Sequence, residues 1–214
     1  MENRKESEDM KKINQKGFTL IELLAVITIM GILMLVAIPA MQRTIENSRR
    51  GTFANVAGTY VNAIKTAVSG DELKCGTNTG TDLPDGYYYY KFDSTAVTGQ
   101  DLMEQGGKSS WGNSEVKGII IIKKSTTADN KPKFEYSIIM VDSEGRGIGT
   151  GTKTTGVPAA TVIEANLNRA NVNPKDGTYR KLFYQKFPNP TAGQTKWGNT
   201  VIPTGTTITS CSLT

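Results

Sequence analysis

Apolar residues fill the chain from Phe18 to Met41 with Glu22 as the only charge, and the pattern then narrows to a single stripe. About 20 apolar residues are enough for a helix to cross the hydrocarbon core of a membrane. Beyond this stretch, apolar residues recur at steps of three and four, which is typical of one face of an amphipathic helix: Phe53, Val56, Ala57, Tyr60, Ile64, Ala67 and Val68. The pattern predicts one helix of about fifty residues from Phe18 to Val68, stopped by Ser69-Gly70-Asp71.

Two residues inside the apolar stretch should bend or loosen this helix locally. Gly31 gives the backbone extra freedom, and Pro39 removes a hydrogen-bond donor from the helix interior. Lysines 11, 12 and 16 lie just before the stretch, so we expect the N-terminus to remain in the cytoplasm and the bulk of the chain to lie outside. A secretory signal peptide fits poorly because no Ala-x-Ala-like cleavage site follows the apolar residues, whereas a plain single-pass anchor fits the hydropathy well.

After Gly70 the composition shifts toward Gly, Thr, Asn and Asp, and short β-type segments alternate with turn clusters. The predicted strands are Tyr87–Phe92, Val116–Lys124 and Lys133–Asp142, the last two forming an antiparallel hairpin, with a further strand at Tyr179–Phe187 and a short helix around Thr161–Ala170. The predicted fold class is therefore α+β: a long N-terminal helix, membrane-spanning in its first half, packed on an antiparallel β-sheet head.

Composition argues against several kinds of chemistry. The 214 residues carry a net charge of +5, a mild excess that allows weak attraction to anionic surfaces without requiring it. Histidine, the commonest general base, is missing, so we expect no enzyme, no metal site and no cofactor. Cys75 and Cys211 fit a disulfide in an exported domain, although two unpaired buried thiols are the alternative.

The segment from Lys16 to Ala40, KGFTLIELLAVITIMGILMLVAIPA, resembles the N-terminal signature of type IV pilins and their pseudopilin relatives. In that family a short basic leader ends in Gly, a prepilin peptidase cuts before the following Phe, and the new amine is methylated. The resemblance implies cleavage between Gly17 and Phe18 and N-methylation of Phe18. Glu22 matches the family's glutamate five residues into the mature chain, and Pro39 matches its helix-kinking proline.

Two readings of Glu22 follow from its place in an apolar helix. A carboxylate in mid-membrane costs about 2.5–3.5 kcal/mol on insertion scales, so it needs a partner. Either Glu22 reaches the interface and pairs with the amine of its own Phe18, or it pairs with the Phe18 amine of a neighbouring subunit and sets the stagger of helices. The resemblance favours the second reading, in which Glu22 and Phe18 direct filament assembly.

The resemblance also implies a domain organisation and a function. Residues 1–17 would be a cleaved leader, 18–41 the membrane and filament-core helix, 42–70 its amphipathic continuation, and 71–214 the β-rich head. The implied function is that of a structural subunit of a type IV pilus, held in the cytoplasmic membrane before assembly and extracellular afterwards. Its implied partners are copies of itself, the prepilin peptidase and the pilus assembly machinery.

Alternatives within the family share these assembly residues. A pseudopilin of a type II secretion or DNA-uptake machine would build a short piston, and a minor tip subunit would act as an adhesin. A separate hypothesis concerns YRKLFYQKF, Tyr179–Phe187, whose composition suits weak binding of DNA through Arg180, Lys181 and Lys186. The alternative without DNA binding is that this segment is a half-buried strand whose charged side chains are solvated.

Overall fold

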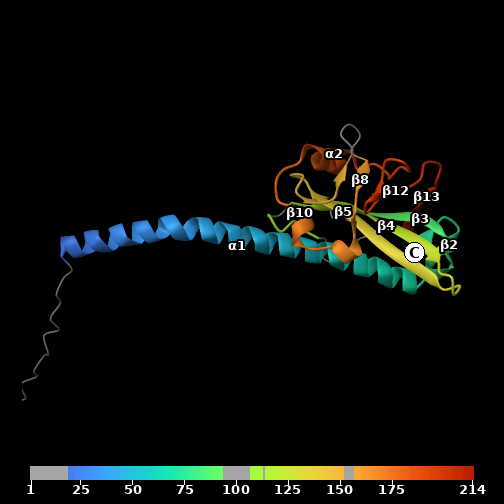
Figure 1. Cartoon of the computed structure of the whole chain (residues 1–214), viewed down its shortest axis with the longest axis horizontal. Helices are drawn as coiled ribbons and strands as arrows, with labels where there is room; N and C mark the ends of the chain where they lie inside the picture. Colours follow the sequence, from blue (N-terminus) through green and yellow to red (C-terminus); the bar gives the residue numbers. More distant parts are fainter. Residues whose placement is uncertain (1–18, 94–106, 113, 152–156) are drawn as a thin grey trace, which may run out of the picture. The chain divides into compact units, whose positions relative to one another are not determined.

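A computed structural model describes residues 19–93, 107–112, 114–151 and 157–214 (Figure 1). The chain divides into two compact units, Met1–Thr44 and Ile45–Thr214. The division falls inside helix α1 (Leu20–Ser69), and the second unit, called the head below, contains the last part of that helix.

Helix α1 confirms the long helix expected from the hydrophobic pattern. The residues of the predicted stripe are buried in the core of the head, except for Val56, which is half-buried. Ala54 and Val61, which the prediction did not include, are buried on the same helix. At the C-terminal end, Gly70 N–H donates to Thr66 O at 2.8 Å, and Asp71 takes a left-handed φ of 55°. This geometry satisfies a carbonyl of the last turn and turns the chain out of the helix, as the Ser69-Gly70-Asp71 sequence predicted.

The rest of the head consists of short strands and helices. In chain order these are β1 (Leu73–Cys75), β2 (Asn78–Thr79), the 3-10 helix η1 (Gly80–Asp82), β3 (Gly86–Asp93), β4 (Val116–Thr126), β5 (Pro132–Asp142), β6 (Gly147–Ile148), β7 (Thr150–Gly151), β8 (Pro158–Ala160), β9 (Val162–Ile163), the 3-10 helices η2 (Glu164–Asn166) and η3 (Arg169–Asn171), β10 (Val172–Asn173), α2 (Thr178–Lys186), β11 (Lys196–Trp197), β12 (Thr200–Val201) and β13 (Ile208–Leu213). The three main predicted strands are confirmed as β3, β4 and β5, each with bounds within two residues of those expected.

The main sheet has the strand order β10-β6-β5-β4-β3-β13-β1-β2, with β9 also paired to β5. Its centre is the predicted β4–β5 hairpin, paired from Val116–Asp142 to Thr126–Pro132. The sheet is antiparallel except for β13, which lies parallel to β3. A second sheet has the order β12-β11-β8-β7. The α+β fold class, a long helix packed on a mostly antiparallel sheet, is confirmed.

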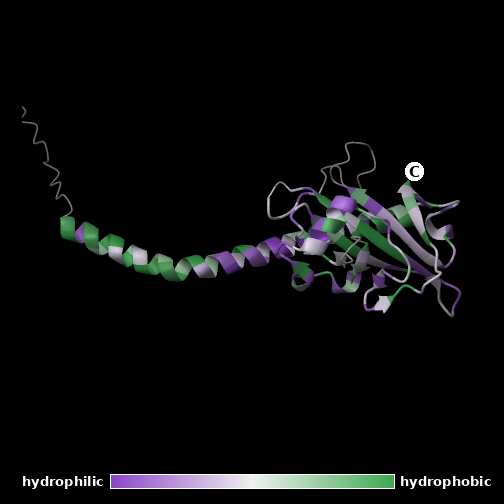
Figure 2. Ribbon diagram, turned by 90° about the horizontal axis from the view of Figure 1, so that it is seen from above, coloured by the Kyte–Doolittle hydropathy of each residue, from purple (hydrophilic) through white to green (hydrophobic). Residues whose placement is uncertain are grey.

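Strand β4 is buried on both faces, which explains its unbroken apolar run. Ile120 and Ile122 belong to the cluster shared with α1, whereas Ile119 and Ile121 belong to a second cluster with Phe183 of α2. Neighbouring strand residues point to opposite faces, so a strand covered on both sides needs apolar residues at every position. Figure 2 shows the apolar inner strands of the head in green.

The prediction of a strand at Tyr179–Phe187 was wrong, because most of the segment forms helix α2. Tyr179, Phe183 and Phe187 are spaced four apart and so share one helical face. Phe183 is fully buried, and its ring meets that of Phe187 at 5.6 Å. Phe187 caps the helix with a φ of 40°, and Pro188 follows it. The four-residue spacing of these aromatics agrees with a helix, in which Phe183 and Phe187 share the face that is packed on the sheet.

The helix predicted around Thr161–Ala170 was also wrong. Val162 and Ile163 form β9 on the edge of β5, and two 3-10 turns follow. Asparagine side chains take over the main-chain bonding there: Asn168 Oδ1 accepts from Ala170 N at 2.8 Å, and Asn171 Nδ2 donates to Asn166 O at 2.6 Å. Such local side-chain bonds compete with an α-helix, which accounts for the irregular backbone.

A close contact at Gly118 of β4 locks the ring of Phe92 against α1. The Phe92 ring is stacked on Tyr60 with 4.0 Å between centroids, and both residues are buried. A Cβ at Gly118 would lie 2.1 Å from Phe92 Cζ and 2.6 Å from Ile139 O. The position therefore requires glycine for close approach of the ring.

We expect Gly118→Ala to lower the free energy of unfolding of the head by about 1–3 kcal/mol, because the Phe92 ring and the Ile139 carbonyl must both shift. The matched control is Gly51→Ala, in α1, where a Cβ meets nothing within 4 Å. That control should be neutral or stabilise by up to about 1 kcal/mol, since alanine favours a helix interior. Denaturant unfolding of the detergent-solubilised full chain measures both changes. Equal stability of the two variants would contradict the steric argument.

Candidate assembly site

The first turn of α1 contains a reciprocal pair of hydrogen bonds between Thr19 and Glu22. Thr19 N–H and Thr19 Oγ1 both donate to Glu22 Oε2 at 2.8 Å, and Glu22 N–H lies 3.4 Å from Thr19 Oγ1. Thr19 thus serves as the N-cap and Glu22 as the third helical residue, the arrangement known as a capping box. The bonds supply acceptors to main-chain donors that a helix start leaves unsatisfied.

This role of Glu22 was missed from the sequence, although the Thr-x-x-Glu spacing was there to be seen. One carboxylate oxygen, Oε2, is engaged within the helix's own first turn, and among the described residues 19–93, 107–112, 114–151 and 157–214 the other oxygen, Oε1, has no hydrogen-bond partner. Gly17 and Phe18, the predicted cleavage and methylation residues, lie outside the described part of the chain. The pairing of Glu22 with an amine on Phe18 therefore stays a prediction.

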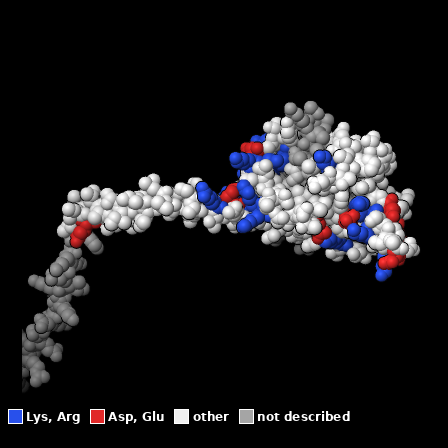
Figure 3. Space-filling view, viewed as in Figure 1, with Lys and Arg blue, Asp and Glu red and all other residues white. Residues whose placement is uncertain are grey.

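In the apolar part of α1, the side chains are exposed on all sides of the helix. Large apolar residues from Leu20 to Met41 are between 50% and 84% exposed. The helix is long and apolar enough to cross a membrane. Figure 2 shows this stretch as almost continuously green, and Figure 3 shows it with few charged atoms. A surface of this size and composition needs lipid or other protein to cover it.

Gly31 and Pro39 both lie inside the continuous helix α1. A Cβ at Gly31 meets no atom within 4 Å, so no contact in this unit requires glycine there. Pro39 has no main-chain N–H, and the carbonyl of Leu35 consequently lacks its usual donor four residues on. The predicted kink or flexibility at these two positions stays a prediction.

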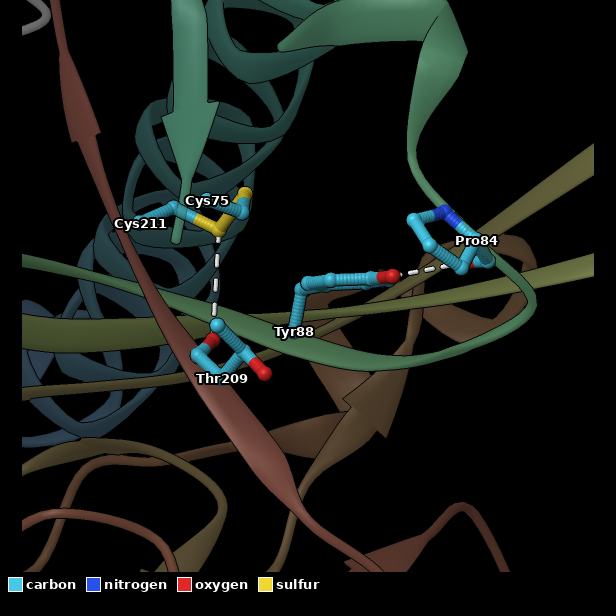
Figure 4. The surroundings of a disulfide bond; sticks show 5 residues. All are labelled: Cys75, Pro84, Tyr88, Thr209 and Cys211. Carbon is cyan, nitrogen blue, oxygen red and sulfur yellow. Dashed lines mark hydrogen bonds between the residues drawn. A yellow bond between two sulfur atoms is a disulfide. The ribbon is translucent and has the colours of Figure 1, made fainter. Parts of the chain in front are cut away.

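Cys75 and Cys211 form the predicted disulfide. They are directly opposite each other in the antiparallel pair β1–β13, with Cα atoms 4.1 Å apart and 136 positions apart in sequence (Figure 4). Nearby, Tyr88 Oη donates to Pro84 O at 2.7 Å, and burial, aided by Asp85, raises the pKa of the Tyr88 phenol. The bridge joins β1, the strand that directly follows α1, to β13, the last strand in chain order.

Residues 107–112 fasten the last part of α1 to the edge of the sheet. Trp111 Nε1 donates to Glu46 Oε2 at 3.2 Å, and Ser110 Oγ donates to Arg49 O at 2.7 Å. On the sheet side, Ser109 Oγ donates at 2.8 Å to Asp142, a fully buried carboxylate that also accepts from Arg146 Nε at 2.8 Å. Sequence reasoning missed this network because its members are far apart along the chain and no short motif links them.

The basic residues proposed to contact DNA are engaged within the head. Arg180 Nε donates to Gly145 O at 2.6 Å. Lys181 pairs with Glu144 at 3.2 Å, and that carboxylate raises the pKa of Lys181. Phe183 is buried and offers no face for a base to stack on. Binding of DNA by this segment, Lys186 included, stays a prediction with little geometric support.

Comparison with known proteins gives matches at the N-terminus and beyond it. A family model described as the prokaryotic N-terminal methylation motif matches residues 12–38. The type IV major fimbrial protein FimA of Dichelobacter nodosus is 43% identical over 90 residues, which are 40% of this chain and 58% of that protein. The fimbrial protein EcpC of Eikenella corrodens is 30% identical over 131 residues, 60% of this chain and 86% of that protein. The chain belongs to the type IV pilin family.

No solved structure matches this pilin. The family resemblance inferred from residues 16–40 is confirmed, since the matches extend well past the apolar stretch. This pilin aligns with only a little over half of the length of FimA, so that protein's full activity and assembly come to it only as proposals.

We expect Thr19→Val to fray the first turn of this pilin's α1 without preventing membrane insertion. Valine keeps the shape of threonine but can neither accept from Glu22 N–H nor donate to Glu22 Oε2. Loss of an N-cap costs about 0.5–2 kcal/mol locally. Hydrogen exchange of the detergent-solubilised protein should show faster exchange for the amides of residues 20–23. The control is Thr28→Val, whose hydroxyl only bonds back to Ala25 O, and unchanged exchange in the Thr19 variant would exclude the cap.

Removing the bridge by the double change Cys75→Ser and Cys211→Ser should lower the free energy of unfolding by about 2–5 kcal/mol, because the closed loop is long. Non-reducing mass analysis of alkylated wild-type protein should find no free thiol. Reduction of the wild type should reproduce the stability of the double variant. Alkylation of both cysteines without a reductant would contradict the bridge.

Proposed function

We propose that this protein is a structural subunit of a type IV pilus. The observation that carries the proposal is the part of α1 from Leu20 to Met41, an apolar surface whose one charge, Glu22, lies in the first turn. Membership in a family with fimbrial relatives supports it. In this proposal the prepilin peptidase cuts after Gly17 and the new N-terminus at Phe18 is methylated. Residues 18–41 then hold the subunit in the cytoplasmic membrane.

Assembly would move this surface from lipid into a bundle of identical helices. The apolar faces exchange one nonpolar environment for another, so the transfer itself has little hydrophobic driving force. Direction and register must come from a polar group. Glu22 supplies it: Oε2 remains on Thr19, and Oε1 accepts from the Phe18 ammonium of the neighbouring subunit. A buried charge with a single complementary partner is an effective register device.

The other partners follow from the same proposal. The pilus assembly machinery would extract subunits from the membrane, and the heads would face outward in an extracellular filament. FimA of Dichelobacter nodosus is a major fimbrial protein, which favours an abundant pilin over a pseudopilin or a minor tip adhesin. An abundant band in sheared surface filaments separates these alternatives, since a pseudopilin or a tip subunit would not supply one.

We expect Glu22→Gln to reduce surface filaments by about tenfold or more, because it removes a charge-assisted bond worth about 1.5–3 kcal/mol per contact. Glu22→Asp keeps the charge on a shorter stem and should retain part of the assembly. Both variants should reach the membrane in wild-type amounts, each with the mass calculated for its own processed and methylated chain. Sheared filaments, membrane fractions and N-terminal mass analysis give the three readouts.

Thr28→Val, in the same apolar stretch, is the control for a general effect of substitution. Filaments of wild-type abundance from Glu22→Gln would remove Glu22 from the assembly role. An intact, unprocessed N-terminus in the wild type would remove the proposed maturation at Gly17 and Phe18.

A further inference from the structure

A pocket of about 610 Å³ on the head is lined in part by residues of β10 and of the start of α2. Figure 1 labels these two elements. Gly147 and Gly149 are among the pocket's lining residues, and Gly147 is opposite Asn173 in the β6–β10 pair. Both residues have positive φ, 141° and 78°, a backbone conformation that favours glycine. This part of the lining therefore carries no side chains. The volume lies within the range of about 300–1,000 Å³ found for sites that hold small molecules.

Among the described residues that line this pocket, every charged side chain is positive. Arg50 comes from α1, whereas Lys175 (after β10) and Arg180 (in α2) lie only five residues apart, so two parts of the chain that are distant in sequence converge. No Asp or Glu is among the lining residues that the structure describes. Three cations around one opening produce a positive potential that attracts an anion.

The guanidinium of Arg180 is held in place by the main chain. Its Nε donates to Gly145 O at 2.6 Å and its Nη2 donates to Lys175 O at 3.0 Å. Burial lowers the pKa of Arg180, and the charge of Asp142 opposes that shift. A guanidinium stays protonated in proteins, so this half-buried group is a fixed cation whose remaining donors can serve a ligand.

Of the two nearby acids, Asp142 has partners of its own, whereas Glu46 partly offsets the charge of Arg50. Asp142 is fully buried and accepts from Ser109, Arg146 and two main-chain amides. Glu46 lies 3.5 Å from Arg50 Nε, an ion pair without a hydrogen bond, while its other oxygen accepts from Trp111. Arg50 therefore keeps donors in addition to the nitrogen that faces Glu46.

The remaining wall combines amides with small apolar groups. Asn171 Nδ2 donates to Asn166 O and Asn173 Oδ1 accepts from Lys175 N, so each asparagine keeps a second amide atom for a ligand. Ala160, Ala170 and Pro174 supply apolar surface without bulk. A bare inorganic anion would use the cations alone, whereas hydroxyl groups on an apolar ring would use the amides and the small residues as well.

We propose that this pocket binds an anionic sugar unit, a single pyranose ring that carries a carboxylate or sulfate group. The charged group lies against Arg180 and Lys175 with Arg50 nearby, and the ring hydroxyls contact Asn171 and Asn173. The site is separate from α1's apolar surface and does not depend on the proposed role in a pilus. It gives the head a ligand specificity of its own.

The test is calorimetric titration of the full-length protein in detergent with methyl glucuronide, glucose 6-sulfate, methyl glucoside and sodium sulfate. We expect saturable binding of the glucuronide, the sulfated sugar or both, weakened by added salt, and at least tenfold weaker binding of the neutral glucoside. Whichever anionic sugar binds more tightly identifies the charged group. Glucoside binding as tight as either anionic sugar, sulfate alone binding as tightly, or no saturable binding overturns the proposal.

Variants separate the pocket from general charge effects. Lys175→Gln should weaken the anionic sugar about two- to fivefold, as for an exposed ion pair. Arg180→Lys should weaken it about tenfold, because the charge stays but the planar fork is lost. Ala170→Phe should exclude the ring without changing charge. Lys131→Gln, on the loop of the β4–β5 hairpin, is the matched control and should bind as the wild type does.

Arg180 also holds two carbonyls, so its variant can fail by unfolding, and denaturant curves for each protein identify that outcome. Lys175→Gln and Ala170→Phe then carry the decision, since Lys175 is exposed through its side chain and Ala170 lies on the surface. Wild-type affinity in both of these variants, or equal loss in Lys131→Gln, places the sugar elsewhere and rejects the pocket.

Discussion

The contact between the stripe of α1 from Phe53 to Val68 and one face of the main sheet is the interaction on which the head depends. It buries Ile120 and Ile122 on that face, and α2 covers Ile119 and Ile121 on the other. Residues 107–112 and the Cys75–Cys211 bridge are both attached to this helix or its immediate continuation. The helix is thus a wall of the head's core and, before Ile45, part of a separate unit.

Elements with a strong hydrophobic period were predictable from the sequence. The type and approximate extent of the α1 stripe and of strands β3, β4 and β5 were identified correctly. Burial on one or both faces of these elements produces a regular pattern of apolar residues in the sequence. Helix α2 was not, since the segment is short and rich in both basic and aromatic residues, a composition that also occurs in strands. The asparagine-rich turns after β9 similarly follow local side-chain bonds that hydropathy does not report.

At the candidate assembly site, the sequence pointed to Glu22 but not to its hydrogen-bond partner Thr19. Glu22 stands out because a charge in an apolar run is costly, and that is a property of composition. Its bond to Thr19 is a property of the helix start and required the capping pattern to be considered. The network around Asp142 and the cationic pocket were beyond prediction, because each joins residues from three or more distant segments.

The bridge between β1 and β13 has a mechanical consequence for a subunit pulled along its length. A force applied between α1 and the C-terminal residues passes from Cys75 directly to Cys211, three positions from the end. The residues enclosed by the bridge are excluded from that path, even if every strand between them unfolds. At about 3.3–3.6 Å per residue, a separation of 136 positions withholds roughly 450–490 Å of extension. Under such tension the covalent bond, not the sheet, sets how far the chain can lengthen.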